Sequence, residues 1–131
     1  MESVKVVKID HLVLTVKDID ITSKFYSEVL GMAIVSFGEG RKALTFGDQK
    51  INLHETGKEF EPKALNPTLG SSDLCFITYD PMEMMLKQLK NQGVSVIKGP
   101  VKRTGARGTI NSVYINDPDG NLIEISTIWS D

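Results

Sequence analysis

The sequence contains very little cysteine, with Cys75 as the only one among 131 residues. A single cysteine cannot form an internal disulfide, so a small scaffold held together by disulfides is excluded. Cys75 lies in an apolar segment, which predicts a buried side chain that behaves as a small hydrophobic residue.

Long hydrophobic runs and an excess of one charge are also missing. The apolar runs are only a few residues long, whereas a bilayer span needs about 20, so we expect no transmembrane segment. The amino end has no signal-peptide pattern, which favours a cytoplasmic location. Fifteen Lys and Arg stand against 17 Asp and Glu, a formal net charge of −2, so neither nucleic acid nor a membrane is an expected partner.

The composition is that of one ordinary globular domain. The chain is 40% hydrophobic and 24% charged, which suits a single domain with a normal core. In the first half, residues 8–16 form a predicted strand, and Asp18 or Asp20 caps a predicted helix that ends before Gly31. Three short strands are predicted next, at 32–37, 41–46 and 50–54.

The second half repeats this order of elements after an irregular segment at 56–72. A strand is predicted at 73–78, and the run Asp80-Pro81-Met82-Glu83 has the cap and proline signals of a helix start. We expect this helix to end at Gly93. Further strands are predicted at 94–97, 111–116 and 121–128, with an inserted loop at 100–109.

The two halves align with each other at their structural joints. Asp18 aligns with Asp80 at the helix cap, and Gly31 aligns with Gly93 at the helix stop. We interpret this as an internal duplication. The predicted fold class is α+β, a single domain of two tandem βαβββ modules that enclose a cavity, with module 1 at about 6–56, a linker at about 57–71 and module 2 at about 72–129.

Alternation along the predicted strands places five polar groups on sheet faces away from the helices. Unless they are paired, such groups are costly to bury, and imidazole with carboxylate is typical of a divalent-metal site. Each also has a structural alternative, such as a hydrogen-bonded strand histidine or a solvated carboxylate. The five residues are His11, Asn52, His54, Asp73 and Glu124.

Three segments carry a resemblance to a known family. They are residues 9–16 (IDHLVLTV), 25–32 (FYSEVLGM) and 117–124 (DPDGNLIE). In order and spacing they resemble the vicinal oxygen chelate superfamily of glyoxalase I, bleomycin resistance proteins, fosfomycin resistance enzymes and extradiol dioxygenases. With residues 46–54 (FGDQKINLH) the chain is most similar to the small proteins called glyoxalase domain-containing protein 5 and their bacterial relatives.

The resemblance implies paired βαβββ modules forming a curved mixed-sheet cleft around one divalent metal ion, such as Zn, Ni, Mn, Co or Fe. His11 and Glu124 match family ligand positions, whereas Asn52 and Asp73 depart from the usual Glu and His. His54 is the candidate third ligand, and Glu124 or Asp73 is the candidate catalytic base. The candidate substrate-binding residues are Asn52, Arg41, Arg103, Arg107 and Tyr114.

The resemblance therefore predicts a metal-dependent enzyme of lyase or isomerase type that acts on a small oxygen-rich molecule. Two alternatives stay open: a dioxygenase or fosfomycin-resistance-type transferase, and a metal-free, ligand-sequestering protein of the bleomycin-resistance type. By the same analogy we expect a homodimer with a small-molecule substrate.

Overall fold

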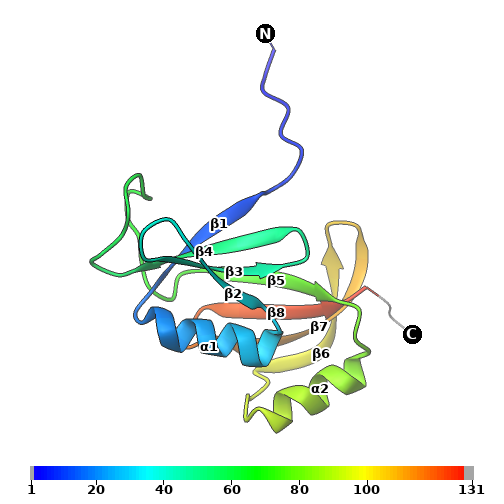
Figure 1. The fold of residues 1–131 in the computed structure, drawn as a ribbon. Coiled ribbons are helices and arrows are strands. Elements are labelled where there is room, and N and C mark those ends of the chain that lie inside the picture. Colours follow the sequence, from blue (N-terminus) through cyan, green and yellow to red (C-terminus); the bar gives the residue numbers. More distant parts are fainter. Residues whose placement is uncertain (1, 129–131) are drawn as a thin grey trace.

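The computed structural model describes residues 2–128, and the predicted module end at residue 129 lies outside this range. Two four-stranded sheets and two helices make up the regular structure of the described residues (Figure 1). The elements are β1 (His11–Val16), α1 (Ile19–Leu30), β2 (Ala33–Phe37), β3 (Arg41–Phe46), β4 (Gln49–Glu55), β5 (Asp73–Thr78), α2 (Met82–Asn91), β6 (Lys98–Gly105), β7 (Gly108–Asn116) and β8 (Leu122–Thr127).

The two sheets have the same topology. The first has the strand order β1-β4-β3-β2 and the second the order β5-β8-β7-β6. In each sheet the first and last strands of the unit are parallel neighbours, and the remaining pairs are antiparallel. The predicted α+β fold of two βαβββ units is confirmed.

The first helix begins and ends where the sequence predicts. The Asp18 carboxylate accepts a hydrogen bond from the Ile21 amide at 3.0 Å, which satisfies a free N–H of the first turn. The helix ends at Gly31, whose φ of 68° lies in the left-handed region that glycine tolerates. The start of α2 differs from the prediction, because Pro81 occupies the cap position and no side chain makes a capping hydrogen bond there.

The region before β7 also differs from the prediction. Residues 94–97 are not a strand, and most of the expected loop at 100–109 belongs to the β6–β7 hairpin. The register of this pair shifts between Lys98 and Val101. Proline and glycine signal a loop in a sequence, but here they lie at this irregularity and at the hairpin turn, where strands tolerate both residue types.

The helix-covered sides of the two units share one hydrophobic core. Buried residues of both halves form a single cluster that includes Leu14 and Leu53 from the first and Val113 and Ile123 from the second. Phe46 of β3 and Phe76 of β5 meet edge to face with ring centroids 5.4 Å apart. The helices α1 and α2 run along one side of the molecule (Figure 1). No helix of residues 2–128 is long and apolar enough to cross a membrane.

Candidate functional site

On the face of the first sheet opposite α1, side chains of neighbouring strands lie in register with one another. The register aligns Val13 of β1 with Asn52 of β4, and Asn52 with Ala43 of β3. Two residues before Val13, His11 pairs with Lys50, and two residues after it, Thr15 pairs with His54. The predicted assignment of these side chains to one face therefore agrees with the strand register.

His11 is oriented by its neighbour in sequence. Its Nδ1 lies 2.8 Å from the Asp10 carboxylate, and the imidazole is 43% exposed. The hydrogen bond to His11 lowers the pKa of Asp10 below its ordinary value. With the proton on Nδ1, the Nε2 atom has a free lone pair, which is the arrangement that metal-binding histidines adopt when a carboxylate orients the ring.

Glu124 is oriented by two serines on the second sheet. The Ser112 hydroxyl donates to Glu124 Oε2 at 2.7 Å, and the hydroxyls of Ser112 and Ser126 lie 2.6 Å apart. Strand pairing places Cys75 on one side of Glu124 and Tyr114 on the other. A half-buried carboxylate held in this way is oriented either to bind a cation or to accept a proton.

Asn52 and His54 are buried on the same face of β4, at 6% and 3% relative exposure. Asn52 Oδ1 and His54 Nε2 have no hydrogen-bond partner among the described residues. Burial, and then the charge of Arg41, lower the pKa of His54 below its ordinary value. His54 lies four residues beyond Lys50, the pairing partner of His11, which is about 13 Å along the strand. Asn52 is two residues closer to His11.

Asp73 and Cys75 are exposed on the outer face of β5, so the predicted burial of Cys75 is wrong. Apolar neighbours in sequence indicate a core position. The strand alternates, however, and only Leu74 and Phe76 pack against the shared core. Cys75 points to the side that no helix covers, with its Sγ 3.3 Å from the Ser126 hydroxyl.

Two of the three candidate arginines are held by aromatic side chains. Arg41 lies over the rings of Phe37 and Phe60, at 4.9 and 4.7 Å from their centroids. Arg103 donates from Nε to the Tyr114 hydroxyl at 2.9 Å, and Tyr114 pairs with Glu124 across the strands. Arg107 is exposed in the turn between β6 and β7.

The described part of one chain does not bring the candidate ligands together. Within residues 2–128, no group of three or more His, Cys, Asp or Glu side chains is close enough to hold a metal ion. The helix-covered sides of the two units meet in the shared core, so His11 and Glu124 lie on the faces that no helix covers. His11 and Cys75, the strand-pairing neighbour of Glu124, line a common pocket of about 310 Å³.

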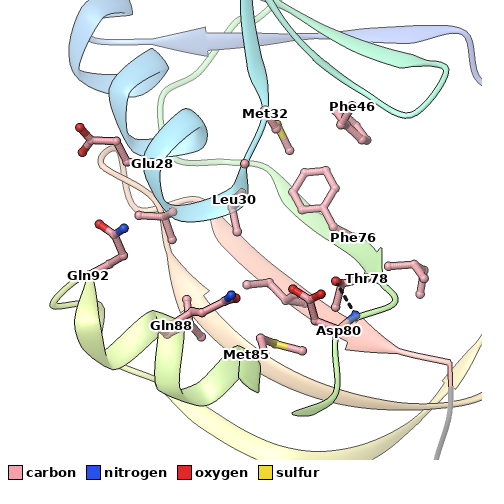
Figure 2. A pocket seen from close by; sticks show the side chains of 15 residues that line it. Glu28, Leu30, Met32, Phe46, Phe76, Thr78, Asp80, Met85, Gln88 and Gln92 are labelled. Carbon is pink, nitrogen blue, oxygen red and sulfur yellow. Dashed lines mark hydrogen bonds between the residues drawn. The ribbon is translucent and has the colours of Figure 1, made fainter. Parts of the chain in front are cut away.

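A separate groove, which sequence reasoning missed, lies away from the predicted site residues. It measures about 440 Å³ and lies between the end of α1, α2 and β5. Figure 2 shows Met32, Phe46, Phe76 and Met85 around it. None of the predicted site residues lines it. Methionines at helical spacing in α2 predict only packing against a core, so the sequence contained no signal for a groove.

The rim of this groove is polar at the end of β5. Figure 2 shows the Asp80 amide donating to the Thr78 hydroxyl, at 3.1 Å. This bond stabilises the turn between β5 and α2, so both side chains serve the local structure of the rim.

Two βαβββ units in tandem, with polar residues on the sheet faces that no helix covers, are typical of one class of proteins. The chain belongs to the glyoxalase/bleomycin resistance protein/dioxygenase superfamily, whose family model matches residues 8–125. The resemblance carried by the three sequence motifs is thereby confirmed.

Several proteins are similar over nearly the whole chain. Virulence protein STM3117 of Salmonella typhimurium is 58% identical over 127 residues, covering 95% of this chain and 88% of that protein. Glyoxalase domain-containing protein RDO1 of Mycosarcoma maydis is 59% identical over 119 residues, covering 91% of this chain and 67% of that protein. A solved structure from the mobile metagenome of V. Pseudocholerae, VPC_CASS1, is 59% identical with a TM-score of 0.96, covering 98% of this chain and 100% of that chain.

Relatives at lower identity include enzymes. Metallothiol transferase FosB of Bacillus licheniformis is 26% identical over 97% of this chain and 79% of its own length. This likeness places a metal-dependent enzyme among the relatives of the chain without identifying its reaction.

Proposed function

We propose that the protein is a divalent-metal-dependent enzyme of lyase or isomerase type, acting on a small oxygen-rich substrate at a site shared by two copies of the chain. One observation carries the proposal. His11 and Glu124 are each held by a hydrogen bond to a neighbouring side chain, as metal ligands are, yet residues 2–128 of one chain contain no group of three or more His, Cys, Asp or Glu side chains that could hold a metal ion.

The donor set fits a divalent cation. His11 presents a ring nitrogen, Glu124 presents a carboxylate oxygen, and the buried Asn52 Oδ1 has no hydrogen-bond partner in the described chain. Imidazole and oxygen ligands suit Zn, Ni, Mn, Co or Fe. Asp73 and His54 are the other candidate ligands, and the distance of His54 from His11 along β4 favours Asn52 and Asp73. When bound, such a metal supplies Lewis acidity, which stabilises an oxyanion.

The chain's own residues supply proton transfer and substrate orientation in this proposal. Glu124, whose carboxylate is already oriented by Ser112, would accept a proton from a carbon next to the substrate oxygens and return it to the product. Asp73 is the alternative base. Arg103, fixed against Tyr114 beside Glu124, and the exposed Arg107 are positioned to bind an anionic part of the substrate.

Exposed apolar surface favours a second copy of the chain as the missing half. Val13 on the first outer face and Ile77 on the second are 45% and 50% exposed, so apolar surface on both faces is open for burial. A homodimer would bury it.

The test is metal content and its dependence on the proposed ligands. Protein purified without chelator is analysed for metal, and the chelator-treated form is titrated with Zn, Ni, Mn, Co and Fe. We expect near-stoichiometric metal in the wild type and its loss in His11→Ala and Glu124→Ala, but not in the control Glu83→Ala on the exposed face of α2. Metal-loaded protein is then screened on 2-oxoaldehyde conjugates, epimerisable thioesters and catechols.

A second candidate function follows from the ligand departures. Asn is a weaker metal ligand than the family's usual Glu, so Asn52 also suits a metal-free, ligand-sequestering dimer. Absence of metal from the purified wild type, with no stabilising shift on adding any of the five metals, would favour that function. Turnover of catechols alone would instead favour a dioxygenase, and transfer of a thiol would favour a transferase similar to FosB.

A further inference from the structure

A second, smaller pocket lies on the outer face of the first sheet. It measures about 250 Å³ and is bounded by β1, β4 and the irregular segment that follows β4. We call it the His54 pocket, and its lining residues are Val13, Thr15, His54, Pro62, Lys63, Ala64 and Pro67. Its volume suits a small acid or one end of a larger substrate.

A buried polar atom without a hydrogen-bond partner lines this pocket. Among residues 2–128, four buried side-chain nitrogen or oxygen atoms make no hydrogen bond, and three of them belong to Arg41, Asn52 and His54. Of these three residues only His54 lines the pocket, whereas Arg41 and Asn52 share its sheet face. His54 is more than nine-tenths buried. Since such a group is normally paired, its free Nε2 indicates that a ligand completes it.

The surroundings of the pocket are positively charged. The Arg41 guanidinium lies over the rings of Phe37 and Phe60, and the Lys50 ammonium lies 4.4 Å from the centroid of Phe37. Lys63 lines the pocket. Its ammonium lies 3.1 Å from the carboxylate of Glu61, which is largely exposed.

The acidic groups near the pocket are few. They are Glu61, which is the partner of Lys63, and Glu59, whose charge acts on His54. The outer-face positions of β1 to β4 carry no carboxylate. The cations of this face therefore outnumber the acids, which favours an anionic ligand.

We propose that the His54 pocket binds a compact oxyanion, a carboxylate or phosphoryl group, next to an O–H or N–H donor on the same small molecule. Resting on the proposed function, this assigns the pocket to the end of the substrate remote from the metal. Lys63 and Thr15 contact the oxyanion, and the positive charge of the nearby Arg41 attracts it. The neighbouring donor pairs with His54 Nε2, so His54 acts as a substrate-binding residue rather than a metal ligand.

The spacing of the two sites adds a requirement on the substrate. His54 and His11 are separated by about 13 Å along β4 and β1. A substrate that reaches both therefore carries its anionic group several bonds away from the oxygens that contact the metal. Small rigid molecules with only adjacent oxygens would fill one site and not the other.

The experiment measures anion binding and metal binding separately in the full chain. Lactate, glycerol 3-phosphate and the neutral 1,2-propanediol are titrated by calorimetry at constant ionic strength into chelator-treated protein. We expect lactate or glycerol 3-phosphate to bind and propanediol not to bind. The tighter of the two anions identifies the oxyanion as carboxylate or phosphoryl.

Three variants assign the binding to the pocket. His54→Gln, Arg41→Gln and Lys63→Met are each expected to weaken anion binding at least tenfold, whereas Lys87→Gln on α2 leaves it unchanged. Lys63 is partly exposed, so its variant tests the pocket even where His54→Gln lowers stability.

The two proposals fail in different ways. Metal content that persists in His54→Gln while anion binding falls supports the pocket as assigned. Failure of both anions to bind the wild type, or binding that all three variants leave unchanged, would overturn the pocket without touching the metal proposal. Loss of metal in His54→Gln would instead show that this histidine is a ligand and overturn its assignment here.

Discussion

At the scale of single residues, orientation by neighbours distinguishes the candidate site from an ordinary polar surface. Asp10 holds the His11 ring and Ser112 holds the Glu124 carboxylate. Sequence alternation predicted the faces of His11 and Glu124, but it contained no information about these hydrogen bonds. Ser112 belongs to no sequence motif, and only the pairing of β7 with β8 places it opposite Ser126 and near Glu124.

The first prediction tests this orientation. Ser112→Ala removes the hydroxyl that donates to Glu124, so we expect metal affinity to fall by about 10- to 100-fold, as for other residues that orient ligands. The measurement is a competition titration with a chromophoric chelator. Ser71→Ala, at an exposed serine, is the control, and equal affinity in the two variants would contradict the role given to Ser112.

At the scale of elements, the hairpin of β6 and β7 shows how a local irregularity supports the site. Gly99 has a φ of 111° and lies at the register shift of this pair. A Cβ added there would collide with the Ser112 carbonyl oxygen and come within 3.0 Å of the Val113 Cα. The glycine therefore lets β6 approach the strand that carries Ser112.

The second prediction compares two glycines with positive φ. Gly99→Ala is expected to lower the free energy of unfolding by about 3 kcal/mol, because both backbone strain and a backbone collision oppose the methyl group. Gly93→Ala meets no atom within 4 Å at a φ of 71°, so strain alone should cost about 1 kcal/mol. Urea denaturation measures both, and equal losses would show that the close approach is unimportant.

At the scale of the whole molecule, one buried hydrogen bond joins the two units. The Tyr26 hydroxyl of α1 donates to Asp117, before β8, at 2.7 Å. Asp117 also accepts from the amide and the side chain of Asn121. Burial, and then the charge of Asp117, raise the pKa of Tyr26 above its ordinary value of 10.0.

The third prediction follows from the sign of that shift. Since the folded state holds the tyrosine proton more tightly, this contribution to stability is present below about pH 10 and is lost as the pH rises above it. Tyr26→Phe should lower the free energy of unfolding by about 1 to 3 kcal/mol at neutral pH and flatten its fall at alkaline pH. Urea denaturation from about pH 7 to 11 checks this, with the exposed Tyr79→Phe as control; identical profiles would refute it.

The fourth prediction tests whether the site is shared by two copies. His11→Ala and Glu124→Ala each lack one proposed ligand in every site. A mixed dimer of the two, however, has one site with both ligands intact, because that site takes His11 from one chain and Glu124 from the other. After random exchange of subunits, we expect about a quarter of the wild-type metal content. No recovery on mixing, in protein shown to exchange subunits, would place the site within one chain.

Local patterns in the sequence were enough to predict the repeat, the boundaries of α1 and the faces of the strands. Caps such as Asp18 and stops such as Gly31 act on their immediate neighbours, and alternation follows from strand geometry alone. For the same reason, the family motifs and the candidate ligands His11 and Glu124 could be selected without coordinates.

Which faces of the two units meet could be learned only from the folded chain. The packing of Phe46 on Phe76 joins the helix-covered sides, and Cys75 lies on an uncovered face. The register shift of β6 and the burial of His54 Nε2 without a hydrogen-bond partner are likewise features of the folded chain. These features depend on contacts between residues far apart in the chain, whose energies no local pattern records.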